Sequence, residues 1–163
     1  MIRPATPDDI PRIVALIREL AEYEKLAHEA VATEADLHDA LFGPEPVAKV
    51  LIAEEEGRTV GFALSFRTFS TFLGRPGIYL EDLYVRPEAR GRGFGKALIE
   101  TLARECAEKN YGRLEWSVLD WNAPSIEFYR RLGAEPRDGW TVMRLSGDAL
   151  ANPTPETGVV TPA

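Results

Sequence analysis

The stretch that most constrains this chain is Arg-Gly-Arg-Gly-Phe-Gly at residues 90–95, in which three glycines alternate with other residues. It follows an apolar run at residues 78–85 that is typical of a strand, and it precedes apolar spacing that is typical of a helix. Alternating glycines let backbone N–H groups approach a ligand closely. A helix N-terminus adds unpaired N–H groups and the positive end of the helix dipole. The sequence therefore predicts an anion cradle, most naturally for a pyrophosphate.

Three glycine patterns compete for this stretch. A Walker loop needs a glycine where Arg90 stands and a hydroxyl where Ala97 stands, so that pattern fails. The dinucleotide fingerprint G-x-G-x-x-G fits poorly, because the spacing here is G-x-G-x-G in the middle of the chain. The pattern Arg-x-x-Gly-x-Gly fits as Arg90, Gly93 and Gly95, and it resembles the acetyl-coenzyme A motif of the GNAT acetyltransferase family. A plain glycine-rich turn is the remaining alternative.

Length and composition narrow the class of protein. A chain of 163 residues suits one domain, which we expect at residues 1–150, followed by a flexible tail at 151–163. Neither a signal peptide nor an apolar run of the ~20 residues that a membrane span needs is expected. The net charge of -7 argues against nucleic acid and is compatible with a cationic substrate. Cys106 is the only cysteine, which excludes an internal disulfide and fits a reducing, cytoplasmic location.

Apolar periodicity and turn residues predict an alternating order of strands and helices. We expect strands at 2–5, 47–53, 59–66, 78–85, 114–118 and 140–145, and helices at 6–23, 33–43, from the glycine loop through residue 106, and 122–133. The strand–helix–strand unit around the glycine loop implies a parallel pair with a right-handed crossover. The predicted class is α/β (α+β): a mixed, mostly antiparallel central sheet with helices on both faces.

Two carboxylates interrupt the apolar strand at 78–85. The apolar positions change parity between residues 78–80 and residues 83–85, which predicts a β-bulge or a strand that is apolar on both faces. Glu81 and Asp82 stand at this change of phase. Burial there would raise the pKa of an unpaired carboxyl, so both are candidate general bases, and we favour Glu81. The alternative is a solvated or salt-bridged acid near a strand bend.

The segment at residues 122–133, Asn-Ala-Pro-Ser-Ile-Glu-Phe-Tyr-Arg-Arg-Leu-Gly, is similar to the GNAT segment that crosses the second half of the cofactor site. Taken alone, Tyr129 would be a packing residue. The start of the chain, the run Tyr-Leu-Glu-Asp-Leu-Tyr-Val at 79–85 and the pair at 139–140 look like the spermidine/spermine (diamine) acetyltransferase branch. This resemblance covers about residues 2–145.

The resemblance implies transfer of an acetyl group from acetyl-CoA to a primary amine by direct attack, without a covalent enzyme intermediate. It implies that Tyr129 is the general acid for the leaving thiolate, and that Glu81 is the general base, directly or through water. Tyr23 and Glu24 would line the amine site. Asp82 and Trp140 would border the same site. The residues that it implies for the cofactor are Leu83, Tyr84, Val85, Arg90, Gly91, Arg92, Gly93, Phe94, Gly95, Lys96, Asn122 and Tyr129.

The identity of the amine stays open at this stage. We expect a polyamine or diamine first, then thia-lysine, another small amine or an amino acid, and last a protein amino group. A non-catalytic acetyl-CoA-binding regulatory module is the rival from another class, and the intact Glu81 and Tyr129 argue against it. Because relatives in the diamine branch are homodimers, we expect a homodimer.

Two other kinds of site are not expected. Cys106 falls on the apolar face of its predicted helix, so it is not expected to act as a nucleophile. The histidines at positions 28 and 38 lack ligand-like companions, so a metal site is not expected.

Overall fold

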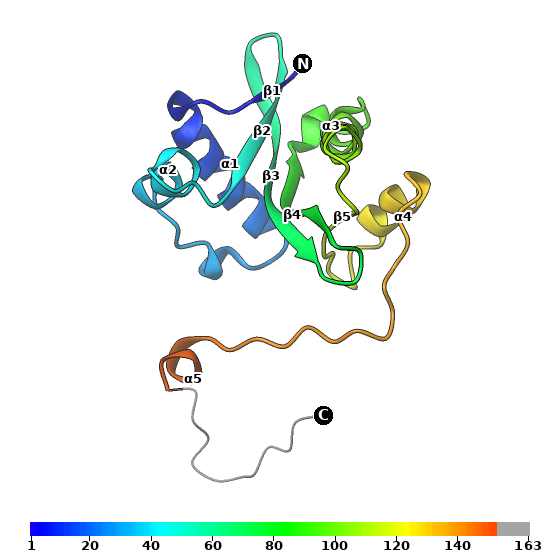
Figure 1. Ribbon diagram of the computed structural model, residues 1–163. Coiled ribbons are helices and arrows are strands. Elements are labelled where there is room, and N and C mark those ends of the chain that lie inside the picture. Colours follow the sequence, from blue (N-terminus) through cyan, green and yellow to red (C-terminus); the bar gives the residue numbers. More distant parts are fainter. Residues whose placement is uncertain (153–163) are drawn as a thin grey trace, which may run out of the picture.

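A five-stranded sheet forms the centre of the computed structural model, which describes residues 1–152 (Figure 1). The strands run in the spatial order β1 (Ile2–Pro4), β2 (Lys49–Glu55), β3 (Arg58–Ser70), β4 (Arg75–Val85) and β5 (Leu114–Glu115). Neighbouring strands pair antiparallel from β1 to β4, and β5 lies parallel to β4. The predicted mixed, mostly antiparallel sheet is confirmed. Residues 153–163, which form most of the predicted tail, lie outside the described residues.

Helices cover both faces of the sheet, as predicted. The α-helices are α1 (Ile10–Tyr23), α2 (Glu34–Phe42), α3 (Phe94–Glu108), α4 (Ala123–Arg131) and α5 (Gly147–Ala151), with short 3₁₀ turns at Pro7–Asp9, Ala27–Glu29 and Pro87–Ala89. One apolar cluster joins α1 and α2 to β2 and β3 around the fully buried Phe62. A second cluster joins α3 to the other face through Leu98 and Leu102, and α4 packs at its margin through Phe128 and Leu132. None of the helices within residues 1–152 is long and apolar enough to cross a membrane.

The phase change in β4 is a β-bulge. Leu64 pairs with Asp82 and the next residue, Ser65, pairs with Leu80, so Glu81 is the extra residue on β4. An extra residue switches which side chains face each side of the sheet. The bulge therefore explains how β4 can bury apolar side chains from even-numbered positions before it and from odd-numbered positions after it. The two adjacent carboxylates, Glu81 and Asp82, lie at the bulge.

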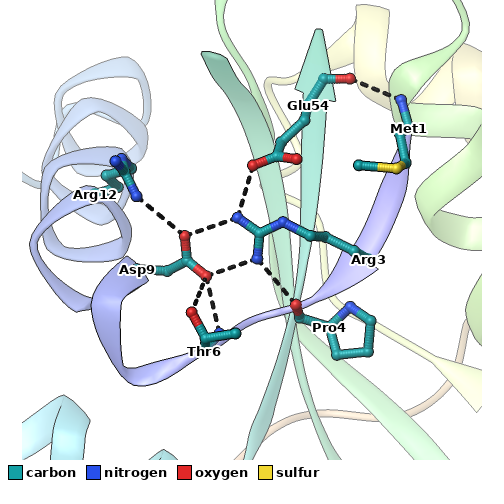
Figure 2. A network of polar contacts seen from close by, with 7 residues as sticks. All are labelled: Met1, Arg3, Pro4, Thr6, Asp9, Arg12 and Glu54. Carbon is teal, nitrogen blue, oxygen red and sulfur yellow. Dashed lines mark hydrogen bonds and ion pairs between the residues drawn. The ribbon is translucent and has the colours of Figure 1, made fainter. Parts of the chain in front are cut away.

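A polar network fixes the start of α1 to the sheet (Figure 2). The Arg3 guanidinium donates to both oxygens of the buried Asp9, at 2.7 and 2.9 Å, and to Glu54 at 2.6 Å. The Thr6 backbone N–H also donates to Asp9, at 2.8 Å. The hydrogen bonds from Arg3 are the main cause that holds the pKa of the Asp9 carboxyl well below its usual range. Arg3 belongs to β1, Asp9 to the 3₁₀ turn before α1, and Glu54 to β2. This network therefore ties these three elements together.

The prediction of a last strand at residues 140–145 is wrong. Residues 134–146 form no regular secondary structure, and Figure 1 shows this segment running away from the sheet towards α5. Its apolar residues suit a strand, but a strand must pair with a sheet edge to satisfy its backbone N–H and C=O groups, and this segment pairs with none of the five strands. The strand expected at 114–118 is likewise shorter, since β5 holds two residues. The short helix α5 was not predicted.

Candidate active site

A cavity of about 780 Å³ opens where β4 and β5 separate. The two strands pair only through Ile78 with Leu114 and Tyr79 with Glu115. Beyond that point residues 80–85 of β4 line one side of the cavity and residues 116–118 line the other. Within the described chain, this edge of β4 has no strand partner from residue 80 onward, so its backbone groups can pair with an extended ligand that carries amides.

The glycine loop closes one end of this cavity. Gly91 and Gly93 have φ values of +75° and +86°, a left-handed conformation that glycine adopts without strain. Gly93 is the N-cap of α3, and its carbonyl accepts the hydrogen bond from the Ala97 N–H at 2.9 Å. The N–H groups of residues 94–96 therefore precede the hydrogen-bonded turns of α3, and these residues line the cavity. This arrangement has the geometry of the predicted anion cradle.

Arg90 is held between two aromatic rings beside the cradle. Its guanidinium carbon lies 4.9 Å from the ring centroid of Tyr23 and 5.5 Å from that of Tyr84. Its Nε donates to the Val85 carbonyl at 2.8 Å, which fixes the base of the side chain on β4. Arg90 thus presents a fixed positive charge at the cavity, where an anionic group would bind.

The other two cations of the loop, Lys96 and Arg92, line different cavities. Lys96 lines the cavity. Arg92 instead donates to Glu55 at 2.6 Å and lines a second, smaller cavity of about 260 Å³. The side chain of Arg92 is therefore not among the residues that the structure brings to the main cavity, although the sequence placed it in the cofactor set.

Three carboxylates line the other part of the cavity: Glu24, Glu81 and Asp82. Asp82 is half-buried, and burial, together with the nearby charges of Glu81 and Glu24, raises its pKa to about 6. Burial also raises the pKa of Glu24. Glu81, the bulge residue, is exposed. A cluster of three acids with partial burial favours a bound cation, because a cation relieves the repulsion among them.

Tyr129 lies on α4 and also lines the cavity. Its ring centroid is 5.0 Å from that of Trp116 and 5.3 Å from that of Phe128. Burial, with smaller contributions from Glu24 and Tyr23, raises the pKa of the Tyr129 hydroxyl to about 12. The hydroxyl is therefore protonated at neutral pH, although burial makes it a weaker acid than the hydroxyl of an exposed tyrosine.

Asn122 caps the N-terminus of α4 and is only 4% exposed. Its Oδ1 accepts hydrogen bonds from the Ser125 N–H at 3.4 Å and from the Tyr23 hydroxyl at 3.1 Å. Asn122 is also among the residues that line the cavity. One residue thus links the cap of α4, the end of α1 and the cavity.

The cavity brings together all the predicted site residues except Arg92 and Trp140. Trp140 is 81% exposed and lies in the 134–146 segment, away from the cavity. The sequence did not identify the remaining lining residues, which are Leu20, Leu80, Ala89, Trp116, Ser117, Val118, Pro124, Ser125, Phe128, Arg131 and Leu132. Residues 116–118 continue the alternation of apolar and polar residues that is typical of a strand. This pattern does not show that the chain separates from β4 after Glu115.

Two features lie outside this arrangement. Cys106 is buried and does not line the cavity, and burial raises the pKa of its thiol. Within residues 1–152 there is no group of three or more His, Cys, Asp or Glu side chains that could hold a metal ion.

Comparisons with known sequences agree with this geometry. The model of the acetyltransferase (GNAT) family matches residues 13–134. The chain is 40% identical to a thialysine N-epsilon-acetyltransferase of Bos taurus over 92% of this chain and 94% of the relative. It is 32% identical to an L-ornithine N5-acetyltransferase of Arabidopsis thaliana over 91% of this chain and 85% of the relative. A spermidine/spermine N(1)-acetyltransferase-like protein of Homo sapiens is 33% identical over 91% of this chain, which corresponds to 23% of that longer protein.

Solved structures share the fold. An integron cassette protein from the mobile metagenome of V. cholerae superposes with a TM-score of 0.78 at 28% identity, over 93% of this chain and 94% of that one. An aminoglycoside acetyltransferase from an uncultured soil sample superposes with a TM-score of 0.74 at 22% identity, over 90% and 96%. The second likeness speaks for the fold alone.

Proposed function

Because the chain belongs to the GNAT acetyltransferase family and is an N-acetyltransferase, we propose that it transfers an acetyl group from acetyl-CoA to the primary amine of a small cationic substrate. Enzymes of this family use acetyl-CoA in general. The observation that carries the proposal is that one cavity is lined both by the residues of the anion cradle and by three carboxylates and Tyr129. An anionic donor and a cationic acceptor could thus meet inside one site.

The residues around the cavity fit acetyl-CoA. The cofactor supplies its acetyl group as an activated thioester. Residues 94–96 and Arg90 would hold the pyrophosphate, because they offer unpaired N–H groups and a fixed positive charge. The free edge of β4 at Leu83–Val85 would pair with the amides of the pantetheine arm, as an added strand would.

The acceptor amine must lose a proton before it can attack, since an aliphatic ammonium has a pKa near ~10. The sequence favours Glu81 as the base that takes this proton. The structure supports Asp82 as well, because burial raises its pKa to about 6, which is close to neutral pH. Its side chain is also less exposed than that of Glu81. We propose that Asp82 accepts the proton, directly or through water, and that Glu81 and Glu24 hold the incoming cation.

Tyr129 would complete the transfer. The sulfur of the departing thiol needs a proton, and a hydroxyl that stays protonated at neutral pH can supply it. Binding both reactants in one cavity supplies proximity, so the amine can attack the thioester without an enzyme-bound intermediate. Backbone N–H groups on the free edge of β4 near the bulge would polarise the thioester carbonyl.

The acceptor is proposed to be a terminal amine on a short aliphatic chain. Thialysine, ornithine and the polyamines, which appear in the names of the relatives, share this group. The carboxylates at the cavity would recognise its positive charge. The relatives are named for thialysine and ornithine acetylation, and one is named as a spermidine/spermine N(1)-acetyltransferase-like protein. The structure of the acceptor beyond its terminal amine is therefore the point that the experiment must decide.

The test is thiol release from acetyl-CoA with a panel of amines: spermidine, spermine, putrescine, lysine, ornithine, thialysine and a peptide with a free N-terminus. We expect thiol release with the first six compounds, which are small amines, and none with the peptide. Preference for the diamino acids over the polyamines would assign the acceptor to the amino acid class. Turnover with the peptide alone would contradict a small-molecule acceptor.

A regulatory module that binds acetyl-CoA without turnover is the rival function. It predicts tight binding of acetyl-CoA and no thiol release with any amine at any pH. The presence of Tyr129 and three carboxylates in the cavity favours the enzyme, since binding alone requires none of them.

We also propose that the chain forms a homodimer in the cytoplasm. The support for a dimer is the resemblance to the diamine branch and the exposed apolar residues of the 134–146 segment, including Trp140 and Val142. The support for the cytoplasm is the single cysteine, Cys106, which suits a reducing compartment.

A further inference from the structure

Tyr23 contacts two other residues that line the cavity, Arg90 and Asn122. It is the last residue of α1, and its ring carries the Arg90 guanidinium at 4.9 Å on the side of the glycine loop. On the other side, its hydroxyl donates to Asn122 Oδ1 at 3.1 Å. Its ring also lies against Trp121, with the centroids 6.2 Å apart. A residue from α1 thus contacts both Arg90, which lies beside the anion cradle, and Asn122, which caps α4.

The contact with Asn122 determines which end of its amide faces the cavity. Both hydrogen bonds to Asn122 use Oδ1: one comes from Tyr23 and one from the Ser125 N–H. An amide has one acceptor oxygen and one donor nitrogen, so these bonds leave Nδ2 as a donor for other partners. The bond from Ser125 is long, at 3.4 Å, and so is weak. The Tyr23 hydroxyl is therefore the stronger constraint on the orientation of the amide.

The ring and the hydroxyl of Tyr23 have separable effects. The ring supports Arg90, whose guanidinium is also 5.5 Å from Tyr84 and whose Nε is bound to the Val85 carbonyl. A ring without the hydroxyl would keep this support, because the attraction between a cation and a ring comes from the aromatic face. Only the hydroxyl reaches Asn122.

We propose that Tyr23 is a positioning residue for the cofactor. Its hydroxyl orients the Asn122 amide so that Nδ2 donates into the cavity, and its ring holds Arg90 in place beside the cradle. This inference rests on the proposed function, since acetyl-CoA is the ligand that both groups would contact. It gives Tyr23 a role on the cofactor side, whereas the sequence placed it in the amine site.

The test compares Tyr23→Phe with Tyr23→Leu. The dissociation constant of coenzyme A is measured by titration calorimetry without an amine present. Tyr23→Phe should weaken binding about five-fold, which is the usual effect of losing one hydrogen bond. Tyr23→Leu should weaken binding further, because it also removes the ring from Arg90. The KM for the amine should change less than two-fold in Tyr23→Phe.

A second substitution isolates the pathway through Asn122. Asn122→Ser keeps a side chain that can cap α4 but removes the amide. In the Asn122→Ser background, Tyr23→Phe should have no further effect on the affinity for coenzyme A, because the group that Tyr23 orients is gone. Additive losses in the double variant would overturn the proposal.

A readout without any ligand separates this inference from the proposed function. The side-chain NH₂ signals of Asn122 in an NMR spectrum should shift in Tyr23→Phe and stay unchanged in a control such as Tyr111→Phe. If the wild-type protein fails to bind coenzyme A, the proposed function and the cofactor role of Tyr23 both fail, although the shift would still show that Tyr23 orients the amide. If it binds equally well with and without the hydroxyl while the amine KM rises, Tyr23 is an amine contact and only this inference is wrong.

Discussion

Burial affects the two groups that are proposed to move protons in the cavity, Asp82 and Tyr129, in different ways. Burial raises the pKa of both Asp82 and Tyr129, to about 6 and about 12. At neutral pH the carboxyl of Asp82 is mostly ionised and can take a proton, whereas the hydroxyl of Tyr129 keeps its proton and can give it. The same physical cause, removal from water, makes Asp82 a stronger base, whereas it keeps Tyr129 protonated and makes its hydroxyl a weaker acid than that of an exposed tyrosine.

Tyr129→Phe tests the acid. It removes the hydroxyl and keeps the ring against Trp116 and Phe128, so the cavity should keep its shape. We expect kcat to fall about 100-fold, within the usual range for general acid catalysis, with little change in the affinity for acetyl-CoA. Steady-state kinetics and calorimetry measure the two quantities. An unchanged kcat would remove Tyr129 from the proton transfer.

Asp82→Asn and Glu81→Gln test the base. In the wild-type protein, kcat/KM should rise as pH increases through about 6, where Asp82 ionises. Asp82→Asn should abolish this rise and regain activity at high pH, where the amine is already free. Glu81→Gln should mainly raise the KM for the amine. If the pH profile is lost in Glu81→Gln and kept in Asp82→Asn, Glu81 is the base.

The raised pKa of Asp82 also has a consequence for stability. A carboxyl whose pKa is raised by folding binds its proton more tightly in the folded protein, so its contribution to stability is greatest below pH 4 and is lost as pH rises through about 6. At pH 7.5, Asp82→Asn should therefore increase the free energy of unfolding by on the order of 2 kcal/mol. At pH 3.5 the gain should vanish. Denaturant titrations at the two pH values compare these predictions.

The start of α3 requires glycine at position 93 but not at position 95. Gly93 has φ +86°, whereas Gly95 lies inside the helix with no positive φ, and an added Cβ there would meet Phe128 at an ordinary 3.5 Å. Gly93→Ala should cost about 1–2 kcal/mol of stability and weaken the binding of coenzyme A. Gly95→Ala is the matched control for stability and should be neutral. Equal losses of stability would show that the conformation of Gly93 is not the cause.

The network around Asp9 should make the first helix sensitive to acid. Asp9 has a pKa held well below its usual range by Arg3, so its contribution to stability is present above pH 4 and is lost as pH falls below that value. Asp9→Asn breaks a buried pair and should cost about 3 kcal/mol at neutral pH. Asp8→Asn, on the neighbouring exposed residue, is the control and should change stability little. A variant of Asp9 as stable as the wild type would mean that the network does not stabilise α1.

The sequence predicted the elements whose cause is local. Gly93 and the following apolar spacing predicted α3. The change of parity around Glu81 predicted a β-bulge or a strand that is apolar on both faces, and the structure shows the bulge. The cavity itself was not predictable as geometry, because it depends on β4 and β5 separating after two pairs of residues. The direction of Arg92 was also unpredictable, since its partner Glu55 lies on β2, 37 residues away. Both failures concern contacts between distant parts of the chain.

The segment at residues 134–146 exposes several large apolar side chains to water. Trp140, Val142, Met143 and Leu145 are 61–87% exposed, and they follow one another closely in a stretch that lies away from the sheet. A run of large apolar side chains left in water costs free energy that burial against another surface would recover. Within the described residues these side chains stay exposed, which is why we propose a second copy as the partner of this segment.

The dimer prediction follows from this segment. Val142→Asp together with Met143→Asp should convert the protein from a dimer to a monomer in light scattering coupled to size exclusion, because two charges cannot be buried in an apolar contact without a large cost. Phe72→Asp is the control: Phe72 is 98% exposed, but it lies in the turn between β3 and β4, so the dimer should persist. A wild-type protein that is a monomer at all concentrations would refute the dimer. A dimer that survives the double substitution would place its interface elsewhere on the molecule.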